Sequence, residues 1–296
     1  MNQRWQSFTK SRYLESAGTA GRIGTPLRTL ATGVLMFAGL AAIALAQFPS
    51  SANLRDWIGV DLFDLVAQSD MVGKLSLIIL AIFSISSISV IIYKFLHIRQ
   101  AIRQTDGFIE LCNQGSGDLE EAFRISSNFP DSPLAQILRE AYMELEVEGW
   151  YREGYDLAPD ARVEMVKISL ERIFERTIAS EISHLESKLI FLATTSSVCP
   201  FIGLFGTVWG IMGAFQALSA TGGGTLVTLG PGLSTALLTT VGGLFCAIPA
   251  TVMYNYLAHR IRLLTSQMDS FALELGNIVQ KQVLKQSAGA ATGRGL

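Results

Sequence analysis

The strongest constraint on the fold is a long stretch in the second half of the chain that lacks charged side chains. From Leu189 to Ala258 there is no Asp, Glu, Lys, Arg or His. A helix needs about 20 consecutive, mostly apolar residues to cross the hydrocarbon core of a bilayer. The stretch is therefore long enough for two crossings, and the Gly-rich segment 220–224 supplies the turn between them.

Two further apolar runs precede this stretch, one at residues 29–48 and one between Lys74 and Lys94. Hydrophobic residues make up 49% of the chain and charged residues only 16%, which is too apolar a balance for an ordinary soluble domain. We therefore expect an all-α, polytopic membrane protein. It should have three long transmembrane helices, cytoplasmic helical stalks and an N-terminal hydrophobic leader or extra transmembrane helix.

Lys and Arg next to the apolar runs set the expected orientation, because cytoplasmic flanks of membrane helices carry an excess of them. Arg99 and Arg103 follow the second run, and Arg260 and Arg262 follow the last one, so both of these ends should be cytoplasmic. The predicted segments are 1–48 (basic region and signal-like or transmembrane segment), 49–73 (periplasmic), 74–96 (transmembrane), 97–188 (cytoplasmic helical domain), 189–258 (transmembrane pair with a periplasmic turn) and 259–296 (cytoplasmic helix and disordered tail).

The first apolar run has two interpretations. Basic residues precede it, and Ala44-Leu45-Ala46 has the small-x-small pattern of a signal-peptide cleavage site. The stretch up to Ala46 is, however, longer than the roughly 15 to 30 residues of a usual signal peptide. The segment is either cleaved or retained, and the later topology is the same in both cases.

Helical periodicity continues on the cytoplasmic side of the membrane runs. No Gly or Pro occurs from Ala161 to Cys199, so one helix is expected to pass from the cytoplasm into the membrane without a break. After Ala258, apolar residues from Ile261 to Ile278 alternate spacings of three and four. These stripes could pack within one chain or between subunits, and the sequence leaves both open.

Small residues recur on one face of the third membrane run, where glycines are spaced three, four and three apart. Small residues at such spacing let helices in lipid approach closely, and we expect this face to join copies of the chain. Proline inside a helix removes a backbone hydrogen bond and favours a kink. The predicted helix-packing and kink residues are Pro200, Gly203, Gly206, Gly210, Gly213, Gly242, Gly243 and Pro249.

Threonines share a face of the fourth membrane run, at Thr235 and Thr239. Polar groups at bilayer depth usually face a bundle interior or a water-filled cavity, which makes this face a candidate lining for an ion pathway. The simpler interpretation is that each hydroxyl bonds the carbonyl four residues back in its own helix. Both interpretations fit the residues alone.

Other classes of function find little support in the sequence. The three cysteines and three histidines are scattered, so they indicate neither a disulfide framework nor a metal site. A net charge of −2 gives no basic surface for nucleic acid. A membrane enzyme or a solute transporter would be expected to have intramembrane acids, a metal constellation or inverted repeats, and the sequence indicates none of these. No cofactor is predicted.

Two segments carry a resemblance to a known family. They are Pro200-Phe-Ile-Gly-Leu-Phe-Gly-Thr-Val-Trp-Gly-Ile-Met212 and Ala247-Ile-Pro-Ala, the second followed by Tyr254-Asn255. They resemble the signature of the ExbB/TolQ/MotA proton-channel family, closest to its TolQ and ExbB branches. A looser similarity extends from about Asp61 to Gln282.

This resemblance implies a scaffold subunit in the bacterial inner membrane and not an enzyme. Copies of the chain would form a pentameric ring around a small single-span partner of the ExbD/TolR type. Membrane lipids would surround the ring. Proton flow would drive work on the outer envelope, through TolA in the TolQ branch or through TonB in the ExbB branch. Ile211-Met212 followed by Ala214-Phe215 favours TolQ, while the leader resembles extended forms of ExbB and keeps that branch as the alternative.

The resemblance also assigns site residues. Thr207 and Thr240 match the polar, pore-facing threonines of the family, which extends the predicted ion pathway to Thr207, Thr235, Thr239 and Thr240. The glutamate that the family usually carries in its last membrane helix corresponds to Thr235 here. The scaffold therefore offers no acid of its own in this region, and sodium coupling remains an alternative to proton coupling.

Overall fold

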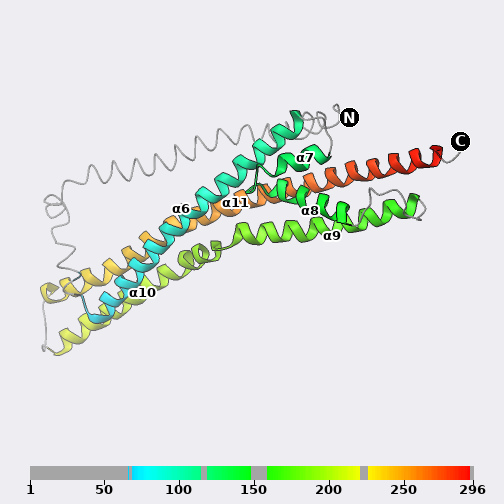
Figure 1. Cartoon of the computed structure of the whole chain (residues 1–296). Coiled ribbons are helices and arrows are strands. Elements are labelled where there is room, and N and C mark those ends of the chain that lie inside the picture. The colour runs from blue at the N-terminus through cyan, green and yellow to red at the C-terminus, as the bar shows by residue number, and fades with distance from the viewer. Residues whose placement is uncertain (1–65, 67–68, 115–118, 148–158, 221–225, 294–296) are drawn as a thin grey trace. The chain divides into compact units, whose positions relative to one another are not determined.

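The structure, a computed structural model, describes residues 66, 69–114, 119–147, 159–220 and 226–293. Its ordered elements are all helical, with no strand in these ranges, which confirms the predicted all-α fold (Figure 1). The helices are α6 (Met71–Gln114), α7 (Leu119–Ser126), α8 (Pro133–Val147), α9 (Pro159–Glu186), α10 (Leu189–Ala220) and α11 (Leu226–Gly293). The first apolar run and its cleavage site lie outside the described residues.

Three helices are long and apolar enough to cross a membrane: Met71–Gln114, Leu189–Ala220 and, within α11, Gly232–Leu284. They coincide with the second, third and fourth apolar runs, so the predicted polytopic membrane protein with three long spans is confirmed. α11 continues to Gly293, into the segment after Ser287 for which a disordered tail is predicted. Alanines at 288, 290 and 291 favour the helix there.

The chain divides into two compact units. The membrane unit consists of the described residues up to Ile91 together with those of Phe191–Met253, and contains the first part of α6, most of α10 and the first part of α11. The stalk unit consists of the described residues of Ile92–Ile190 and the rest of α11 from Tyr254 onward.

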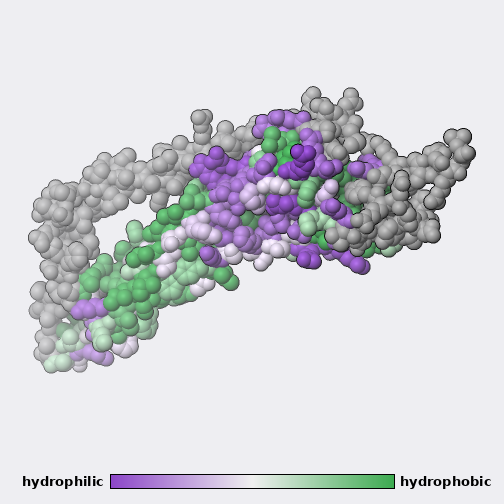
Figure 2. Space-filling model, in the orientation of Figure 1, coloured by the Kyte–Doolittle hydropathy of each residue, from purple (hydrophilic) through white to green (hydrophobic). Residues whose placement is uncertain are grey.

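The membrane unit carries its large apolar side chains on its outer surface (Figure 2). Ile82, Ile85, Phe201 and Phe245 are all exposed. Such a surface matches hydrocarbon, whereas in water it would be an extended apolar patch of the kind that soluble proteins avoid.

The stalk unit has the opposite arrangement, a core of large apolar side chains under a mainly hydrophilic surface (Figure 2). Phe108 of α6 is fully buried and contacts Phe129 and Phe271 edge-on, with ring centroids 6.1 Å apart in each pair. The seam of α11 lies in this core, because Ile261, Leu264, Met268, Phe271 and Leu275 are all buried. Of the two arrangements that the sequence left open, this seam adopts packing within the chain.

The helix predicted to run unbroken from Ala161 to Cys199 is interrupted, so that prediction is wrong. α9 ends at Glu186 and α10 begins at Leu189. Lys188, between them, has a φ of 67°, in the left-handed region that residues other than glycine seldom adopt.

The cause of this break lies in a distant part of the chain, at Lys94 of α6, 90 positions before His184. The Lys94 ammonium, which is only 1% exposed, donates hydrogen bonds of 3.1 Å to the carbonyls of His184 and Leu185 and to Ser187 Oγ. The last carbonyls of a helix lack partners within it and are satisfied by caps. Lys94 supplies that cap from another helix, so α9 ends without Gly or Pro.

Candidate functional site

Three threonines from α10 and α11 form a hydrogen-bonded cluster inside the membrane unit. Thr207 Oγ1 lies 3.0 Å from the Gly203 carbonyl, 3.1 Å from the Ala236 carbonyl and 3.3 Å from Thr239 Oγ1, and it also bonds Thr240 Oγ1. Thr239 Oγ1 lies 2.7 Å from the Ala236 carbonyl and 3.1 Å from that of Gly203. Thr207 and Thr239 are buried. The two helices are thus joined by hydroxyls in an otherwise apolar layer.

The geometry contains the own-helix carbonyl bonds of the simpler interpretation and, in addition, bonds between the two helices; the ion pathway stays a prediction. Thr207 and Thr239 each bond a carbonyl in their own helix, four and three residues back, and each also reaches the facing helix. Thr240 instead bonds α10, at Thr207 Oγ1 and the Gly203 carbonyl. A hydroxyl has one proton to donate and two lone pairs to accept with. Each threonine hydroxyl can therefore rotate to donate its proton to a water or a carboxylate. It cannot itself gain or lose a proton near neutral pH.

Glycines permit this close approach of α10 and α11. A Cβ added at Gly203, Gly206, Gly210 or Gly243 would lie 2.7 or 2.8 Å from an atom of the facing helix. At Gly203 and Gly243 that atom is a backbone carbonyl oxygen, of Thr239 and Cys199 respectively. Such contacts are too short to tolerate without moving a helix.

The glycine face therefore packs on a helix of the same chain, where we expected it to join copies of the chain. Gly213, at the end of the series, faces open space, with nothing within 4 Å of an added Cβ. Gly242 lies toward α6, where an added Cβ would be 3.5 Å from Leu77 and 3.6 Å from Leu80. The expectation failed because spacing alone shows that a helix can be approached closely but not which helix approaches it.

The two predicted prolines lie within helices, Pro200 in α10 and Pro249 in α11. Beside Pro200, Cys199 meets Cys246 of α11 with their sulfur atoms 3.3 Å apart, and both thiols are buried and free. They behave as small core side chains next to Leu80 and Ala247. No group of three or more His, Cys, Asp or Glu that could hold a metal occurs in the described part of the chain.

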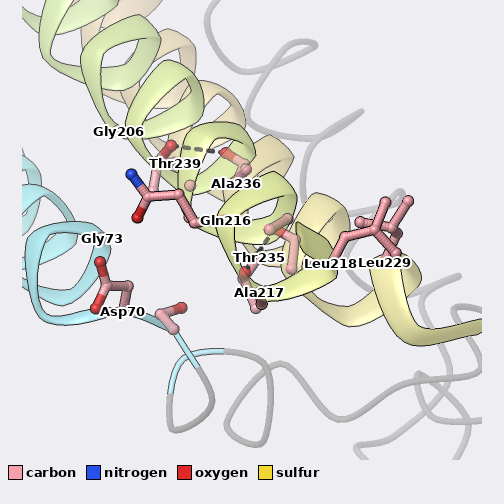
Figure 3. Close-up of a pocket in the computed structure, with 15 residues that line it drawn as sticks. Asp70, Gly73, Gly206, Gln216, Ala217, Leu218, Leu229, Thr235, Ala236 and Thr239 are labelled. Atoms are coloured by element: carbon pink, nitrogen blue, oxygen red, sulfur yellow. Dashed lines mark hydrogen bonds between the residues drawn. The ribbon is translucent and has the colours of Figure 1, made fainter. Parts of the chain in front are cut away.

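Thr235 lies apart from the threonine cluster, toward the start of α11, where its hydroxyl donates to the Gly232 carbonyl at 2.9 Å. It lines a cavity of about 570 Å³ in the membrane unit (Figure 3). The polar lining residues are Ser69, Asp70, Gln216, Thr235 and Thr239, and the small ones are Gly73, Gly206, Gly210, Gly213, Ala214, Ala217, Gly232 and Ala236. Because these glycines and alanines have small side chains or none, they leave the space between the helices unfilled.

Asp70, at the start of α6, is a site residue that the sequence did not reveal. Its Oδ1 accepts the backbone N–H of Met71 at 2.8 Å, and its Oδ2 accepts the indole N–H of Trp209 at 3.0 Å. Figure 3 shows the side chains of Asp70 and Gln216 extending into the same space. An aspartate before a helix can be identified as a cap, but Trp209 is 139 positions away, and no sequence signal links the two.

Taken together, the three apolar helices and their buried hydroxyl cluster define a multi-pass α-helical membrane protein with a polar site inside the membrane unit. Residues 131–270 match the model of the MotA/TolQ/ExbB proton channel family. Relatives of known name match over a longer part of the chain.

Two of these relatives are named Tol-Pal system protein TolQ. The one from Pseudomonas aeruginosa is 35% identical over 224 residues, covering 75% of this chain and 94% of that protein. The one from Haemophilus influenzae is 34% identical over 225 residues, covering 75% and 95%. The biopolymer transport protein ExbB of Pseudomonas putida is 33% identical over 225 residues, covering 76% of this chain and 65% of that protein.

The chain therefore belongs to the MotA/TolQ/ExbB proton channel family. It is a multi-pass protein of the inner membrane and a channel subunit of the TolQ/ExbB type. This confirms the resemblance drawn from the segments at 200–212 and 247–255.

Proposed function

We propose that this chain is the scaffold subunit of a proton-driven motor of the TolQ type. Copies of it would form a pentameric ring around a single-span partner of the TolR/ExbD type, and TolA would carry the resulting work to the outer envelope. The observation that carries the proposal is the buried cluster of Thr207, Thr239 and Thr240 hydroxyls between two membrane-crossing helices.

The chemistry of this cluster calls for a partner. Proton relays in membranes are built from Asp, Glu or His, and the stretch Leu189–Ala258 contains none of them. The hydroxyls of the cluster can hydrate or bond a carboxylate that another helix presents. That carboxylate would titrate, drawing on about 2.3 kcal/mol per charge for each 100 mV of membrane potential. We infer that the chain binds and orients the proton carrier and performs no enzymatic reaction.

The TolQ branch is favoured by the matched lengths. The chain covers 94% and 95% of the two TolQ relatives but 65% of the Pseudomonas putida ExbB and 83% of the Salmonella typhimurium ExbB. An ExbB-type role with TonB is the second candidate, supported by 31% identity over 227 residues to the ExbB of Salmonella typhimurium. Purification of the chain from its native membrane distinguishes the two roles: TolA should co-purify with a TolQ-type subunit and TonB with an ExbB-type subunit.

Reconstitution into liposomes tests the proposal. The full chain alone should show no proton flux above that of empty vesicles, and the chain with its single-span partner should conduct under an imposed pH gradient. A sodium gradient applied to the same vesicles should drive no flux if the coupling ion is the proton. Robust proton flux from the purified chain without a partner would contradict the proposal.

The orientation follows from the same proposal and can be tested separately. We propose that residues 97–188 and the chain beyond His259 lie in the cytoplasm, supported by the Lys and Arg that flank both spans. A membrane-impermeant thiol reagent applied to intact cells should not label a cysteine introduced at the exposed position Asn128. Labelling there before the cells are opened would reverse the orientation.

A further inference from the structure

The cavity lined by Thr235 is large and polar enough to hold water. At roughly 30 Å³ per molecule, its volume of about 570 Å³ corresponds to roughly 20 water molecules. The polar residues Asp70, Gln216 and Thr235 line it, at the start of α6, in α10 and in α11 respectively. Polar residues at membrane depth usually face water-filled space of this kind.

Among the described residues that line this cavity, Asp70 is the one with an ionisable side chain. Its two carboxylate oxygens accept N–H bonds from Met71 and from Trp209. Both of these bonds are accepted by Asp70, and a carboxylate has two oxygens with which to accept hydrogen bonds. Each carboxylate oxygen keeps lone pairs that these two bonds do not use.

We propose that this cavity is a hydrated vestibule through which the driving cation enters, with Asp70 as the anionic group that attracts and binds it. The inference rests on the proposed function. Its ligand is a small monovalent cation, a hydrated proton or an alkali ion, and the oxygens of Gln216 and Thr235 complete the site. Thr239 belongs to both the vestibule and the threonine cluster, so it connects the entrance with the place where a partner carboxylate would be held.

The test uses the full chain reconstituted with its single-span partner, with initial cation flux as the readout. Negative charge in a confined cleft raises the local concentration and entry rate of cations by about 10-fold to 1,000-fold. Asp70→Asn, which retains a helix-capping side chain, should therefore lower flux at least about tenfold, and Asp70→Glu should restore part of it. Parallel proton and sodium gradients distinguish the two cation sources.

Trp209→Phe is the matched control, because it removes the bond to Asp70 and leaves the charge in place. It should keep flux within about twofold of the unmodified complex. Equal losses in Trp209→Phe and Asp70→Asn would show that Asp70 acts only by anchoring α10 to α6, and unchanged flux in Asp70→Asn would also overturn the inference. If the unmodified complex conducts no cation, the proposed function fails first and the vestibule falls with it.

A second variant tests the hydrated space without touching Asp70. Gly213 lines the cavity and has nothing within 4 Å of an added Cβ, so Gly213→Leu should fill the space without displacing a helix. Gly230 is equally open but does not line the cavity, which makes Gly230→Leu its control. Flux should fall at least about tenfold in the first variant only; equal flux in both would show that the cavity is not on the path.

Discussion

Phe245 in the membrane unit and Phe108 in the stalk unit are the same side chain in opposite surroundings. Phe245 is 74% exposed, whereas Phe108 is fully buried. In the membrane unit most buried residues are small (Gly, Ala, Cys, Ser and Thr), alongside Leu80 and Leu192; in the stalk unit the interior holds many Leu, Ile, Met and Phe side chains. Lipid is as apolar as leucine, so helices in it associate through close packing and polar bonds. In water the burial of large apolar side chains drives association.

α11 follows both rules along a single helix. Its buried side chains in the membrane unit are small and include Ala236, Ala247 and Ala250, whereas those in the stalk unit include Leu264, Met268 and Leu275. The comparison therefore predicts that the same substitution has a large effect on stability in one unit and a small effect in the other, and variants can test this directly.

Removal of a phenylalanine should have the largest effect. Phe108→Ala should lower the free energy of unfolding by about 3–5 kcal/mol, because it leaves a cavity next to Phe129 and Phe271. Phe245→Ala, at a lipid-facing position, should change it by less than about 0.5 kcal/mol. Denaturation of the full chain in detergent micelles measures both, and equal losses would contradict the comparison.

Replacement of a glycine by alanine should have the next largest effect on the free energy of unfolding, and only where α10 and α11 are in contact. Gly203→Ala would place a Cβ 2.8 Å from a backbone oxygen of Thr239, so the free energy of unfolding should fall by about 3 kcal/mol, the upper part of the range for overpacking. Gly213→Ala, with open space around it, should cost almost nothing. If the two variants unfold alike, the contact between α10 and α11 is not as close as described.

Loss of the Lys94 cap should have a smaller effect. Lys94→Met removes the donors to the His184 and Leu185 carbonyls and should lower the free energy of unfolding by about 1–2 kcal/mol, the cost of buried acceptors left without partners. Amide hydrogen exchange should speed up around residues 184–188 and not in α8. Unchanged exchange at that break would mean that Lys94 does not hold the end of α9.

A modest pH dependence should come from His97 in the stalk unit. Burial, followed by the charges of Lys94, His184 and Lys188, lowers the pKa of His97 below its usual value of 6.5, and Asp131 only partly offsets this. The unfolded chain therefore binds more protons just below pH 6.5, so stability should fall as the pH drops from about 6.5 through the lowered pKa. His97→Gln should flatten this slope in pH-dependent unfolding; an equally steep slope in the variant would assign it to another group.

The spans and the all-α fold could be predicted because long apolar runs are a local pattern. Of the threonine cluster, the four-residue spacing from Thr235 indicated only Thr239, and Thr207 and Thr240 were assigned by the family resemblance. The break at Lys188, the role of Asp70 and the partner of the glycine face could not be predicted. Lys94 acts on α9 across 90 positions of sequence, and Trp209 reaches Asp70 across 139. A glycine spacing indicates that close approach is possible, and only the fold shows which helix makes it.

The most direct test of the central claim, that the buried hydroxyl cluster belongs to the ion pathway, is proton flux through the chain and its partner in liposomes with Thr207→Val. Loss of the bonds from the Thr207 hydroxyl to α11 should lower the free energy of unfolding by only about 0.6 kcal/mol per bond. Proton flux should nevertheless fall at least about tenfold if the hydroxyl orients the proton carrier. Thr251→Val is the control, because its hydroxyl bonds only the Ala247 carbonyl of its own helix, and it should conduct normally. Normal flux in Thr207→Val, or an equal loss in Thr251→Val, would contradict the account.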